Sequence, residues 1–292
     1  MSKTSQELLS QPDCWRVAAA HAERVANQLP KRGARIALAG CGTSLYMAQA
    51  IAAWRESQGH GETDAFAASE MPTERSYDLV VAISRSGTTT EVVQLINELT
   101  PANRVLAITA VPGSPVAEAA TDTIDLAFAD EASVVQTRFA TSVCALWRAH
   151  LGHDVDTLAQ SAAAQLAAVQ EDSLSGLEQF VFLGRGAGAA LASEAALKFR
   201  EAALTWSEAY PAMEYRHGPI SVIGEHSLVW AIGSLASDLE LELRTTGARV
   251  RRSAGDPLVD LVNVHQAAVA LAAEKGLDPD RPRRLTRSVV LT

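Results

Sequence analysis

The residues best suited to acid–base chemistry lie on one stripe of an expected helix. From Gly184 to Pro219 the sequence is GRGAGAALASEAALKFREAALTWSEAYPAMEYRHGP, a glycine turn followed by a helical pattern over about 189–206. At about 100° per residue, one face carries the polar residues Glu194, Lys198, Glu201, Thr205 and Glu208. Apolar residues fill most of the rest, so the helix should be buried and its stripe must be paired internally or line a wet pocket. The simpler interpretation is a Glu194–Lys198 ion pair with two surplus carboxylates in solvent.

Two hydroxyl-rich turns earlier in the chain favour the pocket. GCGTS at 40–44 and SRSGTT at 84–89 each follow a short apolar run and precede a helical pattern. Backbone N–H groups and the partial positive charge at a helix N-terminus favour an anion, and the Ser and Thr hydroxyls add donors. Ordinary helix capping explains either loop alone, but two such loops on consecutive strands predict a phosphomonoester site. Neither has the GK[ST] of a Walker loop, so nucleotide hydrolysis is poorly supported.

The elements that must position these loops predict an α/β fold. Apolar runs at 36–39, 79–83, 105–108 and 123–126 alternate with helical patterns, as in a parallel sheet covered on both faces. Ligands of open parallel sheets bind outside the carboxyl ends of the strands, where both loops should lie. A long helical region is then expected over about 131–171.

The pattern restarts after that region. The run at 180–183, the turn at 184–188 and the following helix echo the first strand, GCGTS turn and helix, and 228–234 echoes the second strand. This predicts an internal duplication with halves meeting near residue 170. Because the second copy lacks the S-x-S-G-T-T pattern, one phosphate site per chain is favoured over two.

Composition argues against several classes of protein, among them nucleic-acid-binding, membrane-spanning and disulfide-rich proteins. A net charge of −9 argues against nucleic acid as the main partner. No apolar run has membrane-spanning length and no signal peptide is evident, which points to the cytoplasm. Three widely spaced cysteines fit neither a disulfide framework nor a zinc site, and no metal or organic cofactor is implied. The basic residues gather near the C-terminus, at Arg249, Arg251, Arg252, Arg281, Arg283, Arg284 and Arg287.

The motifs together carry a resemblance. GCGTS, SRSGTT, LGRG, SEAALKFRE, EYRHGP and the closing DPDRPRRLTRSVVLT, in this order, resemble the SIS (sugar isomerase) family, including the isomerase domain of glucosamine-6-phosphate synthase and the phosphosugar isomerase/deaminases. The resemblance covers nearly the whole chain. It implies two tandem SIS domains, each a three-layer α/β/α sandwich around a parallel sheet, at 1–170 and 171–292. It also implies a homodimer with a shared active site.

The resemblance assigns roles to individual residues. It implies that the sugar phosphate is held by Thr43, Ser44, Ser84, Arg85, Ser86 and Thr89, with Arg85 where the synthase usually has glutamine. It makes Glu201 the carboxylate that moves a proton between sugar carbons one and two, with Lys198 one helical turn before it. It makes His217 the ring-opening histidine, contributed across the dimer interface. A carboxylate in a dry pocket and a histidine that titrates near neutrality suit these steps.

Two departures from the family pattern bear on the reaction. The sequence has no N-terminal glutaminase domain and no cysteine at position two, so glutamine-dependent synthesis by this chain alone is not expected. Arg287 stands where the family has a lysine associated with imine or ring-opening chemistry. Arginine stays protonated and does not readily form a Schiff base, although it can bind an anionic oxygen.

The expected function is therefore aldose–ketose isomerisation of a phosphosugar, in particular an amino sugar 6-phosphate, with or without deamination. One alternative is a deglycase of fructosamine 6-phosphates, which the loss of the lysine favours. Another is a regulator that binds phosphosugars without catalysis. The regulator is disfavoured because about 30 N-terminal residues are too few for a DNA-binding domain and because Glu201 and His217 are both present.

Overall fold

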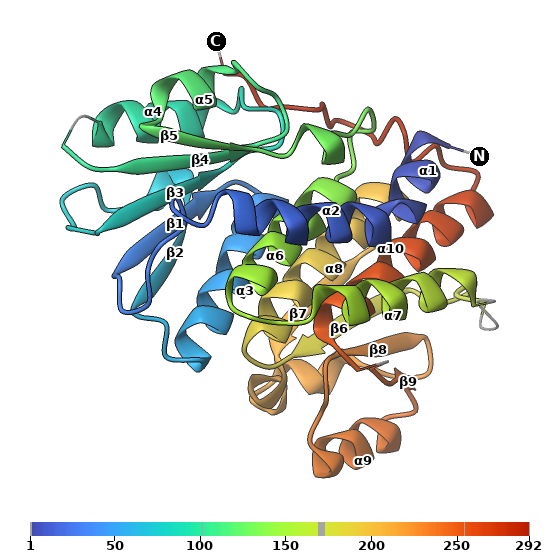
Figure 1. Ribbon diagram of the computed structural model, residues 1–292. Helices are drawn as coiled ribbons and strands as arrows, with labels where there is room; N and C mark the ends of the chain where they lie inside the picture. Colours follow the sequence, from blue (N-terminus) through green and yellow to red (C-terminus); the bar gives the residue numbers. More distant parts are fainter. Residues whose placement is uncertain (1, 101, 169–172, 254, 292) are drawn as a thin grey trace.

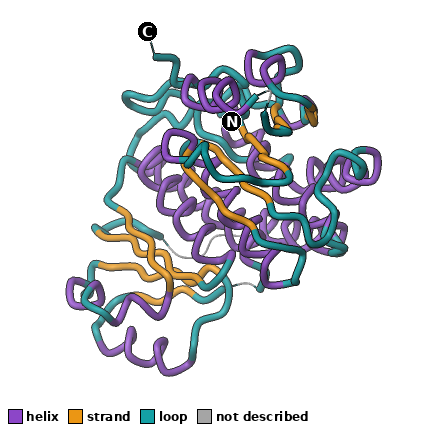
Figure 2. Tube along the Cα trace, turned by 90° about the vertical axis from the view of Figure 1, so that its left-hand side faces the viewer, coloured by secondary structure: helices purple, strands orange, loops and turns teal. Residues whose placement is uncertain are grey.

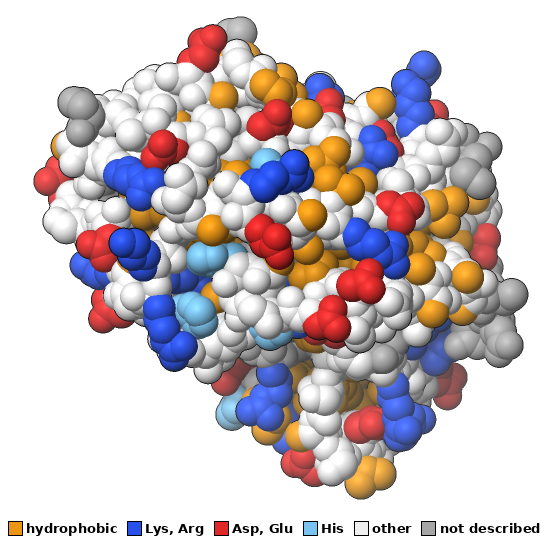
Figure 3. Space-filling model, viewed as in Figure 1, with side chains coloured by type: hydrophobic (Ala, Val, Ile, Leu, Met, Phe, Trp, Pro, Cys, Tyr) orange, Lys and Arg blue, Asp and Glu red, His pale blue; other side chains and the backbone are white. Residues whose placement is uncertain are grey.

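The computed structural model describes residues 2–100, 102–168, 173–253 and 255–291. It confirms the α/β class: two parallel sheets form separate groups of strands with helices packed around and between them (Figures 1 and 2). Acidic and basic side chains are interspersed over the face in Figure 3. Within the described residues, no helix has the length and apolar character needed to cross a bilayer.

The first half contains α1 (Lys3–Leu9), α2 (Gln11–Arg24), β1 (Ile36–Gly40), α3 (Thr43–Ser57), β2 (Thr63–Ala67), the 3₁₀ helix η1 (Ala68–Glu70), β3 (Leu79–Ile83), α4 (Thr90–Leu99), β4 (Val105–Thr109), α5 (Pro115–Ala119), β5 (Asp122–Asp125), η2 (Ala127–Ala129), α6 (Arg138–His150) and α7 (Val155–Ala167). The second half contains β6 (Gln179–Gly184), α8 (Ala187–Ala203), β7 (Ser207–Pro211), η3 (Ala212–Arg216), η4 (Pro219–Val222), β8 (Ser227–Ile232), α9 (Ser237–Thr245), β9 (Arg249–Arg251) and α10 (Pro257–Glu274).

The two sheets repeat one topology. Their strand orders are β2-β1-β3-β4-β5 and β7-β6-β8-β9, so the second sheet has the order of the first without its last strand. Gly40 of β1 pairs with Ile83 of β3, and Gly184 of β6 pairs with Ile232 of β8. The turns that follow these strands therefore leave each sheet side by side at its carboxyl edge.

The first turn of each half has the same backbone. Gly42, which precedes α3, has φ 54° and ψ −123°, and Gly186, which precedes α8, has φ 54° and ψ −126°. Residues with a Cβ rarely adopt this conformation. At Gly184 a Cβ would lie 2.1 Å from the carbonyl oxygen of Gly188, so a glycine also lets this strand pass close to its helix. The expected strand–turn–helix repeat is thus present in three dimensions.

The helices between the sheets join the halves through one core. A single cluster of buried side chains contains Leu38 of β1 and Phe182 of β6. It also contains Phe199 of α8, whose ring centroid lies 5.1 Å from that of Phe182. Because α3 and α8 pack against each other here, residues from both halves can meet in one site.

The structure corrects the expected length of α8. The helix ends at Ala203 because Leu204 adopts a left-handed backbone with φ 47°. Thr205 therefore lies in a turn and Glu208 lies on β7, so neither continues the polar stripe of Glu194, Lys198 and Glu201. Trp206, expected on the apolar face, is 72% exposed.

The helical region expected over 131–171 is also divided. Residues 131–137 form a loop, and α6 and α7 follow with a break between them. The Asp154 side chain accepts a hydrogen bond from the backbone N–H of Thr157 and so caps the start of α7. The proposed boundary between residues 170 and 171 lies outside the described residues.

Candidate active site

The two hydroxyl-rich turns lie at the carboxyl edge of the first sheet, as expected. Thr43 and Ser44 begin α3 and are both buried. In the second turn, the Ser84 hydroxyl accepts a hydrogen bond from the backbone N–H of Gly87 at 3.2 Å and lies 3.3 Å from the Thr89 hydroxyl. The turn is therefore wound tightly between β3 and α4, with its hydroxyls on one short segment.

Lys198 connects the first of these turns to α8. Its Nζ donates to the Thr43 hydroxyl at 3.1 Å, lies 3.4 Å from Glu194 Oε1 and contacts the Glu201 carboxylate. The Thr43 hydroxyl in turn donates to Glu194 Oε1 at 3.2 Å. Only Glu201 of these side chains is partly exposed, at 19%. The structure thus brings a loop of the first sheet and the proton-transfer candidate of the second half to one place.

Burial and charge act against each other in this cluster. Burial raises the pKa of Glu194 to about 7, although Lys198 opposes that rise. Burial alone would lower the pKa of Lys198, but the Glu194 and Glu201 carboxylates outweigh it and the pKa is raised. Lys198 is therefore a protonated ammonium at neutral pH, whereas the pKa of Glu194 itself lies close to neutral pH.

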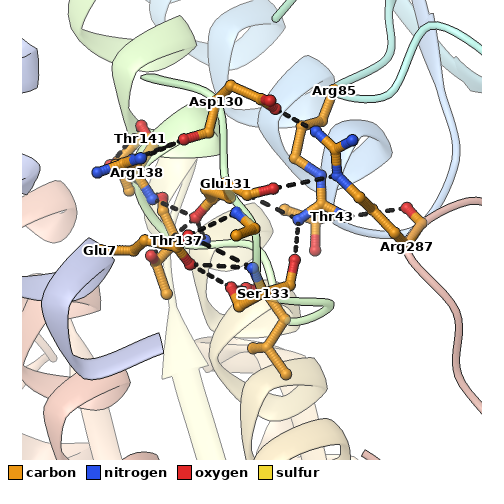
Figure 4. A network of polar contacts seen from close by, with 12 residues as sticks. Glu7, Thr43, Arg85, Asp130, Glu131, Ser133, Thr137, Arg138, Thr141 and Arg287 are labelled. Carbon is orange, nitrogen blue, oxygen red and sulfur yellow. Dashed lines mark hydrogen bonds and ion pairs between the residues drawn. The ribbon is translucent and has the colours of Figure 1, made fainter. Parts of the chain in front are cut away.

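The Arg85 side chain is buried and points away from the hydroxyls of its own turn. Its guanidinium donates to the carbonyl oxygens of Ser133 and Arg287, both at 2.9 Å, and Nη1 lies 3.7 Å from Glu131 Oε2 (Figure 4). Burial raises the pKa of Glu131, which Arg85 opposes, and burial lowers the pKa of Arg85. These contacts hold the 131–137 loop and the C-terminal segment against β3.

The C-terminal segment lies over the SRSGTT turn. The Ser288 hydroxyl lies 3.0 Å from that of Ser86 and 2.8 Å from that of Thr88. The backbone N–H of Thr90 donates to the carbonyl of Val289 at 3.2 Å. The Arg287 guanidinium donates to the carbonyl oxygen of Glu131 at 3.0 Å and contacts the Asp130 carboxylate. Arg287 thereby lies beside the SRSGTT turn, although about 200 residues separate the two in the sequence.

His217 is not part of this cluster. It follows η3 and is exposed, and no hydrogen bond or ion pair within the described residues joins it to Glu201. The same region carries the exposed apolar side chains Trp206, Met213 and Val222. The structure of one chain therefore assembles the other named residues around two neighbouring turns and leaves His217 on the surface.

Three buried carboxylates beside the site were not predicted as part of it. Glu194 was assigned only an ion pair, and Glu131 and Glu7 were not singled out. Glu131 Oε1 accepts from the Thr137 hydroxyl at 2.9 Å, and Glu7 of α1 accepts from the backbone N–H of Ala132 at 2.6 Å. Their partners lie in the 131–137 loop, which the sequence predicts as helix, so the sequence gives no signal for these contacts. Among the described residues, no group of three or more His, Cys, Asp or Glu side chains could hold a metal ion.

Residues 29–148 match the family model described as SIS domain. The glutamine–fructose-6-phosphate aminotransferase (isomerizing) of Sulfolobus acidocaldarius is 27% identical over 299 residues, covering 89% of this chain and 51% of that protein. The protein of the same name from Sulfurisphaera tokodaii is 31% identical over 252 residues, covering 73% of this chain and 42% of that protein. The chain thus spans about half the length of these curated relatives or less.

Solved structures resemble the chain over its whole length. Glucosamine-6-phosphate deaminase from Thermotoga maritima has a TM-score of 0.85 and 26% identity, and the match covers 99% of this chain and 100% of that one. Tagatose-6-phosphate ketose/aldose isomerase from Escherichia coli has a TM-score of 0.83 at 21% identity over 96% and 95% of the two chains, a likeness of fold. The family model matches only the first half, so of the two expected SIS domains one is identified. Residues 29–148 thus carry a SIS domain, and the rest of the chain resembles proteins named as phosphosugar enzymes.

Proposed function

We propose that this protein is a sugar-phosphate isomerase that acts on an amino sugar 6-phosphate, with or without release of the amine. The observation that carries the proposal is the contact of Lys198 with both Thr43 and Glu201, which places a candidate proton carrier beside an anion-binding turn. The names of the similar proteins, a deaminase, a ketose/aldose isomerase and an isomerizing aminotransferase, support the same reaction class.

In this proposal the phosphate is held by the two turns. The hydroxyls of Ser44, Ser84, Ser86 and Thr89 and the backbone N–H groups at the starts of α3 and α4 recognise its oxygens. Glu201 removes a proton from one sugar carbon and returns it to the next through an enediol. The protonated Lys198, held between Glu194 and Glu201, orients the Glu201 carboxylate.

The proposal includes a homodimer with two SIS domains in each chain, at 1–170 and 171–292. His217 of one chain then opens the sugar ring in the site of its partner. Two observations support this part: His217 is exposed, and Trp206, Met213 and Val222 leave an apolar surface in the same region. The repeated strand order of the two sheets supports a second domain of the same kind.

A deglycase of fructosamine 6-phosphates is a second candidate, because Arg287 lies at the phosphate turn. A lysine there could form an imine, whereas the Arg287 guanidinium contacts Asp130 and the carbonyl of Glu131. Cleavage of such an adduct uses the same enediol-type proton transfer by Glu201 and requires no imine to the protein.

A time course by NMR in D₂O tests both candidates. The substrates are fructose 6-phosphate, glucosamine 6-phosphate, galactosamine 6-phosphate and a fructosamine 6-phosphate. Deuterium entering at carbon one or two supports enediol chemistry, and released amine distinguishes deaminase and deglycase from isomerase.

Glu201→Gln should abolish exchange while phosphosugar binding is retained. Glu208→Gln, which changes a carboxylate bonded to Trp206 and Tyr210, is the matched control and should keep activity. Binding without exchange in the unaltered protein would favour the regulator instead.

A further inference from the structure

The carboxyl edge of the second sheet carries a crevice lined by arginines. Two adjoining cavities of about 300 and 360 Å³ share Gly233, Ser234 and Gly255. Arg185 lines one cavity, and Arg251, Arg252 and Ser253 line the other. We call these residues the arginine crevice. Each cavity has the volume of a small-molecule site.

The arginine crevice occupies the place in the second sheet that the SRSGTT turn occupies in the first. The SRSGTT turn follows β3, which pairs with β1, and Gly233 and Ser234 follow β8, which pairs with β6 in the same order. Open parallel sheets bind ligands outside the carboxyl ends of their strands. The duplicated fold therefore presents a second binding position, with arginines in place of hydroxyls.

The charges of the arginine crevice favour an anion. Arg185 is exposed and has no ion pair within the described residues. The carboxylate of Glu240, which also lines the crevice, lies 2.7 Å from Arg252 and 2.8 Å from Arg244, so two cations offset it. Figure 3 shows basic and acidic side chains together low on the molecule, over the region of β8, β9 and α9. Three arginines, Arg185, Arg251 and Arg252, line the crevice with one carboxylate, that of Glu240.

The walls of the arginine crevice are held in place by a buried carboxylate. Asp260 of α10 accepts hydrogen bonds from the backbone N–H of Gly233 at 2.7 Å and from the Ser253 hydroxyl at 2.5 Å. The Arg251 guanidinium carbon lies 4.2 Å from the centroid of the Trp230 ring, which holds the guanidinium end of that side chain over the sheet. Gly233 and Ser253 are thus held in place before any ligand binds.

We propose that the arginine crevice is a second anion site, which binds the phosphate group of a small phosphorylated molecule. Arginine guanidinium groups match phosphate geometry with paired N–H donors. The described lining residues include no histidine, and the carboxylates of Glu240 and Asp260 are engaged by protein donors, so the site binds a ligand without transforming it. This inference goes beyond the proposed reaction and does not depend on it.

Isothermal titration calorimetry with inorganic phosphate and with fructose 6-phosphate tests the proposal. Unaltered protein should bind two equivalents of fructose 6-phosphate per chain. Ser86→Ala, which weakens the site at the first sheet, should leave one equivalent. Adding Arg185→Ala and Arg252→Ala should weaken that remaining equivalent at least tenfold, since two charge-assisted contacts are lost.

Arg104→Ala is the matched control, because Arg104 is a partly exposed arginine that pairs with Asp122 on the first sheet. It should leave both equivalents unchanged. The arginine changes should not lower the unfolding temperature of the protein that receives them, because Arg185, Arg252 and Arg104 lie on the surface. The proposal would be overturned if the unaltered protein bound one equivalent and Ser86→Ala bound none. It would also be overturned if a second equivalent were bound equally well after the Arg185 and Arg252 changes. A failure of the proposed isomerase would be seen separately, as absence of turnover with the arginine-dependent equivalent intact.

Discussion

The ammonium of Lys198 is enclosed by two carboxylates, and a buried charge is tolerable only while its partners remain. Glu194 is fully buried on one side of it, and Glu201 is partly exposed on the other. The cluster therefore has a structural half and a half that can reach a substrate. Changes to the two halves should separate stability from activity.

Replacing Lys198 by methionine should destabilise the protein by about 3–5 kcal/mol at pH 8, because the Glu194 charge is left buried without its cation. The double variant Lys198→Met with Glu194→Gln should recover part of that loss. Urea unfolding of both variants at pH 8 measures the difference. Equal stability of the single and double variants would show that the two side chains are not energetically coupled.

Stability should fall with rising pH because of Glu194. Its pKa is raised from 4.5 to about 7 in the folded protein, so its contribution is fully present below about pH 4.5 and is lost as the pH rises through about 7. The rise corresponds to at most about 3 kcal/mol. Relative to Glu194→Gln, the unaltered protein should therefore lose stability between pH 5 and pH 8. Parallel unfolding free energies of the two proteins over this range would contradict the assignment.

Part of this cluster could be predicted from the sequence. The spacings of Glu194, Lys198 and Glu201 place them on one helical face, and the structure confirms the Glu194–Lys198 pair. The link to Thr43 could not be predicted, since it joins residues 155 positions apart and depends on how α3 packs against α8. The segment that carries Glu131 was expected to be helical but is a loop, so its contact with Arg85 could not be predicted.

The strand–turn–helix unit occurs twice, and the glycine before the helix has the same backbone conformation in both copies. Gly42 and Gly186 have matching backbone angles, and at neither position would a Cβ meet another atom within 4 Å. A side chain at either position would consequently destabilise the fold only through the backbone strain of a residue with a Cβ at these angles. This allows the two halves to be compared directly.

Gly42→Ala and Gly186→Ala should each destabilise the protein by roughly 1–3 kcal/mol, because alanine is strained at these angles. Thermal unfolding measures the effect. Gly224→Ala is the control, because a Cβ at Gly224 also meets nothing within 4 Å and its φ lies outside the positive range. A control as destabilised as the other two would mean that the backbone angles are not the cause.

At the scale of elements, the sequence was most informative where strands are apolar and buried. β1, β3, β4, β6 and β8 coincide with apolar runs because both faces of a parallel sheet are covered. β2, β7 and β9 were not predicted, because each is an edge strand with polar side chains. Asp64, Glu208 and Arg249 are examples. The early end of α8 was missed because a left-handed Leu204 has no signature in the sequence.

The whole molecule, as proposed, works only as a pair, and mixing two inactive variants tests this. Glu201→Gln and His217→Ala should each be inactive as pure proteins. After joint unfolding and refolding, about a quarter of the sites should recover, because half of the randomly formed dimers are mixed and each has one complete site. Isomerase activity of the mixture is the measurement. If His217 acted within its own chain, mixing would restore nothing.

The contact between the SRSGTT turn and the C-terminal segment has a consequence for biosynthesis. Arg85 donates to the carbonyl of Arg287, which lies 202 positions later, and Ser86 meets Ser288 over the same separation. A chain emerging from the ribosome can form the first sheet and its turns long before these partners exist. The SRSGTT turn thus stays uncovered until residues 287–289 have been made. A nonsense codon just before residue 287 would give a chain that contains the described core and has an open turn.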